Sequence, residues 1–106
     1  MKKPATEVLG RNAQKAEAML KQLAHAGRLM ILCSLVEGEK TVGQLIDLVG
    51  LSQSAVSQHL AKLRDARLVE AEKRGQMVYY RILSMEAQTI LLTLYQIYCG
   101  PRASGK

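Results

Sequence analysis

Two cysteines and two histidines are the side chains best suited to thiol or metal chemistry, and they are Cys33, Cys99, His25 and His59. Soft and borderline metals need three or four nitrogen or sulfur ligands. A thiol-dependent enzyme needs a base within ~3 Å of its nucleophile. His25 stands eight residues before Cys33, which corresponds to roughly 12 Å along a helix. We therefore predict no enzyme, no catalytic residue, no metal ligand and no cofactor.

A second group of polar side chains stands in the stretch SQSAVSQHL, residues 52–60. Projected as a helix, this segment places Val56, Leu60 and Leu63 on one side, and small hydroxyl and amide side chains on the other. Such a face can enter the major groove, where Gln pairs with adenine, Ser reaches several base edges and Lys holds phosphate. A merely solvated face is the alternative. The predicted DNA-binding residues of this segment are Ser52, Gln53, Ser54, Ser57, Gln58, His59 and Lys62.

Apolar residues recurring at helical spacing predict the elements that position these side chains. Thr41 and Gln44 are spaced as a capping box, and Gly50 can end the helix that follows. Ser52 and Ser84 are suited to cap the next helix and the last one. The predicted helices cover residues 6–24, 27–36, 42–49, 52–66 and 84 to about 99, where Gly100 and Pro101 stop the last one.

Between the fourth and last helices the pattern changes to short runs rich in Val, Tyr and Ile around KRGQ. Gly75 permits a tight reversal there, so we predict a two-stranded hairpin. The helices at 42–49 and 52–66, joined by the turn at Gly50 and Leu51, have the arrangement of a helix-turn-helix. Next to it the hairpin would be a wing, with Lys73, Arg74 and Gln76 over the DNA backbone. The predicted fold is mainly α (α+β): a winged helix-turn-helix with five helices and a two-stranded β-hairpin wing.

The composition agrees with one small DNA-binding domain. The 106 residues carry 15 Lys and Arg against 9 Asp and Glu, a net charge of +6, which favours polyanionic partners. We expect a single domain over residues 1–106, with flexible termini at about 1–8 and 101–106. No apolar run approaches the length of a membrane span or a signal peptide. The protein is therefore expected in the cytoplasm, with reduced cysteines and no membrane partner.

The last helix predicts how the chain assembles. Ile90, Leu94 and Ile97 form one apolar stripe, while Leu92 and Tyr95 lie on the other side. A helix that is apolar nearly all round needs cover on two faces. We expect the second cover from another subunit, in a homodimer formed through the first and last helices. The alternative is a fully buried central helix in a monomer.

The run TVGQLIDLVGLSQSAVSQHLAKLRDARLVEAEKRGQMVYYRI resembles the DNA-binding core of the ArsR/SmtB family of winged-helix repressors. The family shares a helix of the form S-Q-S-x-x-S-x-H-L-x-x-L, followed by a strand and a wing ending in Y-R. The resemblance extends over about residues 15–99. It implies a dimeric bacterial repressor, bound to an inverted-repeat operator in double-stranded DNA, that leaves the operator when an inducer binds or reacts.

The family's metal sites do not match this chain. Thr41 and Gly43 stand where arsenic-type members carry thiolates, and the last helix offers Glu86 but no His for a zinc-type site. The pair of Cys33 and Cys99 instead resembles the BigR-like, persulfide-sensing branch, whose two cysteines occupy the second and last helices. This resemblance implies a dithiol switch that responds to persulfide or polysulfide. A metal(loid)-responsive or a constitutive DNA-binding factor remains the alternative, in which Cys33 is simply a small core residue.

Overall fold

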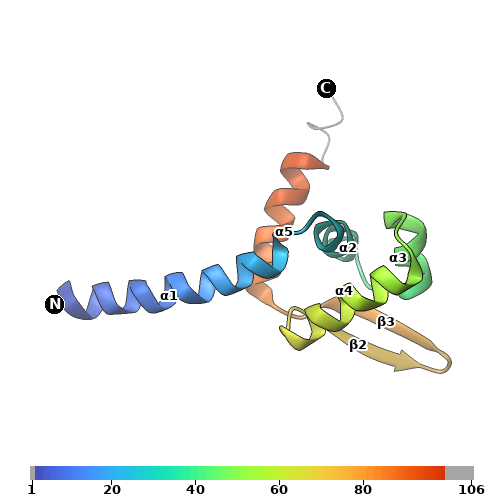
Figure 1. The fold of residues 1–106 in the computed structure, drawn as a ribbon, viewed down its shortest axis with the longest axis horizontal. Helices are drawn as coiled ribbons and strands as arrows, with labels where there is room; N and C mark the ends of the chain where they lie inside the picture. The colour runs from blue at the N-terminus through green and yellow to red at the C-terminus, as the bar shows by residue number, and fades with distance from the viewer. Residues whose placement is uncertain (1, 100–106) are drawn as a thin grey trace.

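The computed structural model describes the backbone of residues 2–99 and the side chains of residues 5–99. Within this range the predicted winged helix-turn-helix is confirmed (Figure 1). The described elements are α1 (Lys2–Leu23), α2 (Ala26–Val36), β1 (Lys40–Thr41), α3 (Val42–Val49), α4 (Gln53–Asp65), β2 (Val69–Arg74), β3 (Met77–Ile82) and α5 (Met85–Tyr98). The expected helix stop at Gly100 and Pro101 and the expected tail at 101–106 lie outside the described residues.

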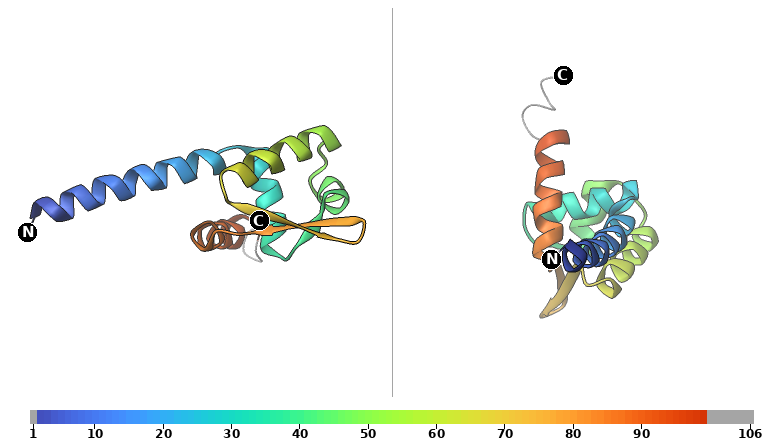
Figure 2. Two further views of the ribbon diagram at one scale, coloured as in Figure 1. Left: turned by 90° about the horizontal axis from the view of Figure 1, so that it is seen from below. Right: turned by 90° about the vertical axis from the view of Figure 1, so that its left-hand side faces the viewer.

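Helix α1 projects from the rest of the molecule (Figures 1 and 2). The sequence predicts a start near Thr6, but the helix begins at Lys2, so residues 2–8 continue it. Ala13, Ala16, Leu20 and Leu23 are apolar residues at helical spacing in α1, and of these only Leu23 is buried, where α1 meets the rest of the molecule. Met19 packs partly against the core, whereas Val8, Leu9 and Leu20 are 43–69% exposed in the single chain.

Helix α5 is covered on one face only. Ala87 and Leu91 are buried and Ile90 packs against the core. Leu92 is 42% exposed and Tyr98 is 72% exposed, so the alternative of a fully buried helix is wrong. The predicted stripe is only partly covered, because Ile97 is 54% exposed. Cover from another subunit stays a prediction.

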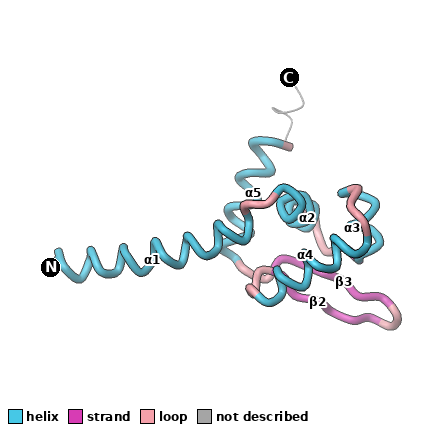
Figure 3. Tube along the Cα trace, viewed as in Figure 1, coloured by secondary structure: helices cyan, strands magenta, loops and turns pink. Residues whose placement is uncertain are grey.

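The sheet has one more strand than the sequence predicts. The β2–β3 hairpin forms as expected and extends beyond the helices (Figure 3). In addition, β1 pairs antiparallel with β3, with Lys40 opposite Tyr80 and Thr41 opposite Tyr79, so the order is β1-β3-β2. Two residues are too short for an alternating pattern. The wing is therefore fixed along one edge to the segment that joins α2 to α3.

The core is aliphatic, as a chain without Phe or Trp requires. Buried side chains of α2, α3, α4 and α5 meet in a single cluster with two residues at the start of the wing. No helix in the described range is both long and apolar enough to cross a membrane. The buried hydrophobic residues are Leu23, Ile31, Leu32, Leu35, Leu45, Val56, Leu60, Leu63, Leu68, Val69, Ala87 and Leu91.

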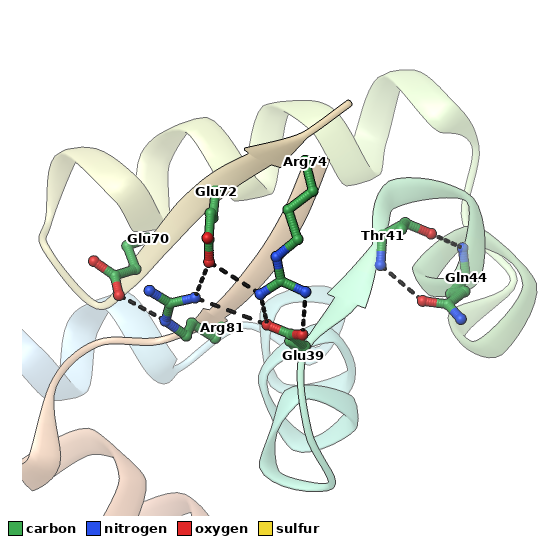
Figure 4. A network of polar contacts seen from close by, with 7 residues as sticks. All are labelled: Glu39, Thr41, Gln44, Glu70, Glu72, Arg74 and Arg81. Carbon is green, nitrogen blue, oxygen red and sulfur yellow. Dashed lines mark hydrogen bonds and ion pairs between the residues drawn. The ribbon is translucent and has the colours of Figure 1, made fainter. Parts of the chain in front are cut away.

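Capping residues set the helix boundaries where the sequence predicts them. The hydroxyl oxygen of Thr41 accepts from the Gln44 N–H, and the Gln44 side chain accepts from the Thr41 N–H, which completes the capping box (Figure 4). Ser52 and Ser84 cap α4 and α5 through the same kind of bond. Gly50 ends α3 with a φ of 70°, which favours glycine. Short turns on both sides of α3 thereby hold α4 against the core.

Thr41→Ala should lower the free energy of unfolding by about 0.5 to 2 kcal/mol, because the first-turn N–H of Gln44 loses its acceptor. Thr41→Ser keeps that oxygen and is the matched control. Urea unfolding at one fixed protein concentration measures both. Equal losses for the two variants would assign the effect to the methyl group of Thr41 and not to the cap.

Candidate DNA-binding surface and dithiol site

Helix α4 has the two faces that the sequence predicts. Val56, Leu60 and Leu63 are buried at 0–1% exposure and fix the helix on the core. Opposite them, the predicted base- and phosphate-contacting side chains of this helix are exposed: Ser52, Gln53, Ser54, Ser57, Gln58 and Lys62. This arrangement presents small hydroxyls and amides on a rigid support, which base-edge recognition in the major groove requires.

His59 differs from its neighbours because its ring is half-buried against His25, with ring centroids 4.7 Å apart. Burial lowers the pKa of His59, and the nearby charges of His25, Arg28 and Lys62 lower it further. His25 caps α2, since its Nδ1 accepts from the Gly27 N–H. The structure thus gives His59 the packing role that links α4 to the start of α2, and a phosphate contact from it stays a prediction.

The wing carries Lys73, Arg74 and Gln76 at its exposed end, as predicted. The guanidinium of Arg74, however, is already engaged. It donates to both carboxylate oxygens of Glu39, at 2.6 and 2.8 Å, and to Glu72 at 3.0 Å (Figure 4). It also lies 4.6 Å from the centre of the Tyr79 ring. Arg74 would have to leave these carboxylates in order to contact DNA. The wing's other predicted DNA contacts are Lys73 and Gln76.

A second arginine extends this ionic network. Arg81 on β3 donates to Glu70 at 2.7 Å and to Glu72 at 2.8 Å. Hydrogen bonds from Arg74 and Arg81 hold the pKa of Glu72 at about 2. Sequence analysis predicted none of these ion pairs. Glu70 and Arg81 stand opposite each other in the hairpin, so a predicted register could have indicated that pair. Glu39 lies outside the hairpin, where no such signal exists.

The two cysteines come together at the contact between α2 and α5. Cys33 is half-buried on α2, and Cys99 is exposed at the end of α5. Both thiols line one apolar pocket of about 250 Å³ together with Leu29, Met30, Leu94 and Tyr98. Burial raises the pKa of the Cys33 thiol, and the nearby Cys99 raises it further. The pocket therefore holds two thiols of unequal exposure and no charged side chain.

Among residues 2–99 no group of three His, Cys, Asp or Glu side chains is arranged to hold a metal ion. The reactive groups that line the pocket are the two thiols. A thiolate is a nucleophile toward sulfur, and a pair of thiols can be joined by oxidation.

Residues 25–71, which include α4 and the start of the wing, match the family described as bacterial regulatory protein, arsR family. The transcriptional activator HlyU of Vibrio cholerae is 44% identical over 84% of this chain and 82% of its own length. This chain belongs to the ArsR family. The biofilm growth-associated repressor of Xylella fastidiosa is 37% identical over 89% of this chain and 82% of its own.

The solved structures agree with the ArsR-family assignment. The crystal structure of the transcriptional repressor BigR from Xylella fastidiosa superposes with a TM-score of 0.83 at 36% identity. The match covers 89% of this chain and 93% of BigR. These proteins are DNA-binding transcription regulators and not enzymes, so this ArsR-family chain is a DNA-binding regulator and the enzyme alternative is excluded.

Gln58→Ala should weaken binding to the DNA sequence that the parent protein prefers by about 1 to 3 kcal/mol, because an exposed amide at the groove is lost. It should also reduce the preference for one base over the others at one position of that sequence. Lys62→Ala on the same helix is the comparison. It should weaken all duplexes alike and reduce the slope of log affinity against log salt by about 1 per subunit. Fluorescence anisotropy against a preferred and a scrambled duplex measures both. Uniform weakening by Gln58→Ala would refute the assigned face.

Proposed function

We propose that this ArsR-family regulator is a dimeric, dithiol-based repressor that leaves its inverted-repeat operator when persulfide or polysulfide bridges Cys33 and Cys99. The observation that carries the proposal is the apolar pocket that both thiols line between α2 and α5. The exposed polar face of α4 supplies the DNA-binding part. The bacterial cytoplasm is the expected setting, because thiols rest reduced there until a sulfur oxidant arrives.

Uncovered apolar surface supports the dimer. Leu9 and Leu20 on α1, and Leu92 and Ile97 on α5, are 42–69% exposed in the single chain. An apolar groove of about 450 Å³ lies between these two helices, lined by residues that include Met19 and Ile90. In a twofold dimer each subunit would cover this surface of the other. Two copies of α4 would then face half-sites one turn of DNA apart, about 34–36 Å.

The proposed reaction begins at Cys99, the exposed thiol. Its thiolate attacks the outer sulfur of a donor R–S–SH, where a new sulfur–sulfur bond forms. The sulfur–sulfur bond of the donor breaks, and its electron pair leaves on the thiolate R–S⁻. The product is a persulfide on Cys99. Cys33 reacts in the second step, because burial raises its pKa and keeps the thiol protonated up to a higher pH.

In the second step the Cys33 thiolate attacks the Cys99 persulfide and expels hydrosulfide, HS⁻. The two thiols are thereby oxidised, and the transferred sulfur is reduced to hydrosulfide. Attack on the inner sulfur yields a disulfide, which requires Cα atoms within about 7 Å. If a polysulfide has placed two extra sulfurs on Cys99, Cys33 attacks the middle sulfur and the terminal sulfur leaves as HS⁻. The product is a bridge of three sulfurs, counting both cysteine sulfurs, that spans a larger gap.

A bridge between α2 and α5 can act on DNA because α5 is also part of the proposed dimer surface. Clamping the two helices changes how α5 meets the partner subunit, and a twofold axis carries this change to the spacing of the two α4 helices. Weakening DNA binding by 10- to 100-fold needs only about 1.4 to 2.8 kcal/mol of coupling.

Leu92→Glu should convert the dimer to a monomer, because it places a charge in the proposed interface. Leu48→Glu is the matched control, since Leu48 is similarly exposed at 56% but lies on α3. Sedimentation at micromolar concentration measures both, and the parent should sediment as a dimer. A monomeric parent, or a dimeric Leu92→Glu variant, would refute the interface.

Cys33→Ser and Cys99→Ser should each bind DNA like the reduced parent but fail to release it when treated with disodium tetrasulfide, because neither can form the bridge. Anisotropy with a 30-base-pair duplex, isolated from a random-sequence library by the reduced parent, follows release. Intact mass follows sulfur gain and hydrosulfide loss. Parallel samples receive hydrogen peroxide or zinc.

The outcomes distinguish the alternatives. A single-cysteine variant that still releases DNA like the parent would refute the dithiol switch. Release of the parent by zinc alone would favour a metal-responsive regulator. A parent whose DNA affinity no reagent changes would be a constitutive factor.

A further inference from the structure

The turn at the end of α2, formed by residues 37–39, is hydrogen-bonded to two distant elements. Tyr95 on α5 donates its hydroxyl proton to the Glu37 carboxylate at 2.9 Å. Two residues later, Glu39 accepts both bonds from Arg74 of the wing, at 2.6 and 2.8 Å (Figure 4). Three consecutive residues thus join the helix that carries Cys99 to the wing that faces DNA.

The backbone of this turn is itself fixed. The N–H of Glu37 and the N–H of Gly38 both bond to the Leu35 carbonyl. Gly38 has a φ of +141°, a conformation that side chains with a Cβ rarely adopt. Immediately afterwards β1 pairs with β3. Because the backbone is hydrogen-bonded on both sides of this turn, we expect a displacement of Glu37 to move Glu39 as well.

On the side of α5, the bond lies next to the thiols. Glu37 stands one helical turn after Cys33, and Tyr95 stands one turn before Cys99. The Tyr95–Glu37 bond therefore spans the same two helices as the thiol pair. The hydrogen bond to Glu37, and after it the negative charge of Glu37, raises the pKa of Tyr95, so a titration of Tyr95 reports on this contact.

On the side of the wing, the contact is more than a single exposed ion pair. Arg74 binds Glu39 through a bidentate fork, binds Glu72 within its own strand, and lies over the Tyr79 ring. Bidentate and networked arginines are the exposed ion pairs that fix geometry. Glu39 thus joins Arg74, at the end of β2, to the turn that follows α2, and it also lies 3.8 Å from Arg81.

We propose that Glu37 and Glu39 are positioning residues that fix the wing relative to α5, so that the wing's placement on DNA depends on how α5 packs against α2. In the reduced protein both bonds hold the wing where Lys73 and Gln76 meet the DNA backbone. The response of this link to bridging of Cys33 and Cys99 rests on the proposed dithiol function. The link between α5 and the wing stands independently of that reaction.

The matched variants change one carboxylate each. Glu39→Gln removes the charge that pairs with Arg74 across elements. Glu70→Gln is the control, because it removes the same charge from a pair with Arg81 that lies within the hairpin. Glu37→Ala removes the acceptor of Tyr95, and Glu37→Gln keeps an oxygen that accepts the same bond. Thermal unfolding confirms that each variant is folded.

The first measurement is amide hydrogen exchange of the reduced proteins. Glu37→Ala should speed exchange in β2 and β3, although Glu37 bonds to α5 and not to the hairpin. Glu37→Gln should exchange like the parent. Ultraviolet titration should report a lower Tyr95 pKa in Glu37→Ala, since its acceptor and the nearby charge are gone. If exchange in the wing of Glu37→Ala equals that of the parent, the link does not exist.

The second measurement is the ratio of the dissociation constants after and before disodium tetrasulfide treatment, with the same selected 30-base-pair duplex. Glu37→Ala and Glu39→Gln should reduce this ratio by about 2- to 30-fold, the range found for residues that couple two sites. Glu37→Gln and Glu70→Gln should keep the parent ratio. An equal reduction by Glu70→Gln would overturn the positioning role, because general loss of wing charge would then explain it. A parent that does not release DNA at all refutes the dithiol function instead, and the exchange result then decides the link alone.

Discussion

Burial of α2 is the constraint on which the rest of this structure depends. Ile31 and Leu32 are completely buried and Leu35 nearly so, and α2 packs against α1, α3, α4, α5 and β3. A small aliphatic core has few other residues with which to hold these elements together. The exposed polar face of α4 and the pocket of Cys33 therefore both depend on elements that pack on the same short helix.

The two ends of α2 contact different parts of the molecule. At its start, His25 caps the helix and its ring contacts His59 of α4. At its end, Glu37 and Glu39 contact α5 and the wing. Because a close-packed interior transmits small displacements, the two proposals give a change in how α5 packs on α2 two routes to α4 and the wing. One route would pass through the proposed dimer, and the other through the turn at residues 37–39.

Local chemistry explains why most of the architecture could be predicted from the sequence. Capping depends on a side chain and the first turn of its own helix, so Thr41, Ser52 and Ser84 marked three helix starts correctly. The faces of α4 follow from periodicity, which placed Val56, Leu60 and Leu63 in the core. Strand β1 was missed because its two residues pair with a strand about 40 residues later, and no local pattern records that pairing.

The sequence by itself determined the helices, the hairpin and the polar face of α4, because each depends on residue type and short-range spacing. Only the tertiary structure decided which side chains are engaged. It set Arg74 against Glu39, packed His59 on His25, and brought Cys33 and Cys99 to one pocket. These contacts join residues that are 34 to 66 positions apart in the sequence. Which residues meet depends on how the other elements pack on α2, and no local sequence pattern records it.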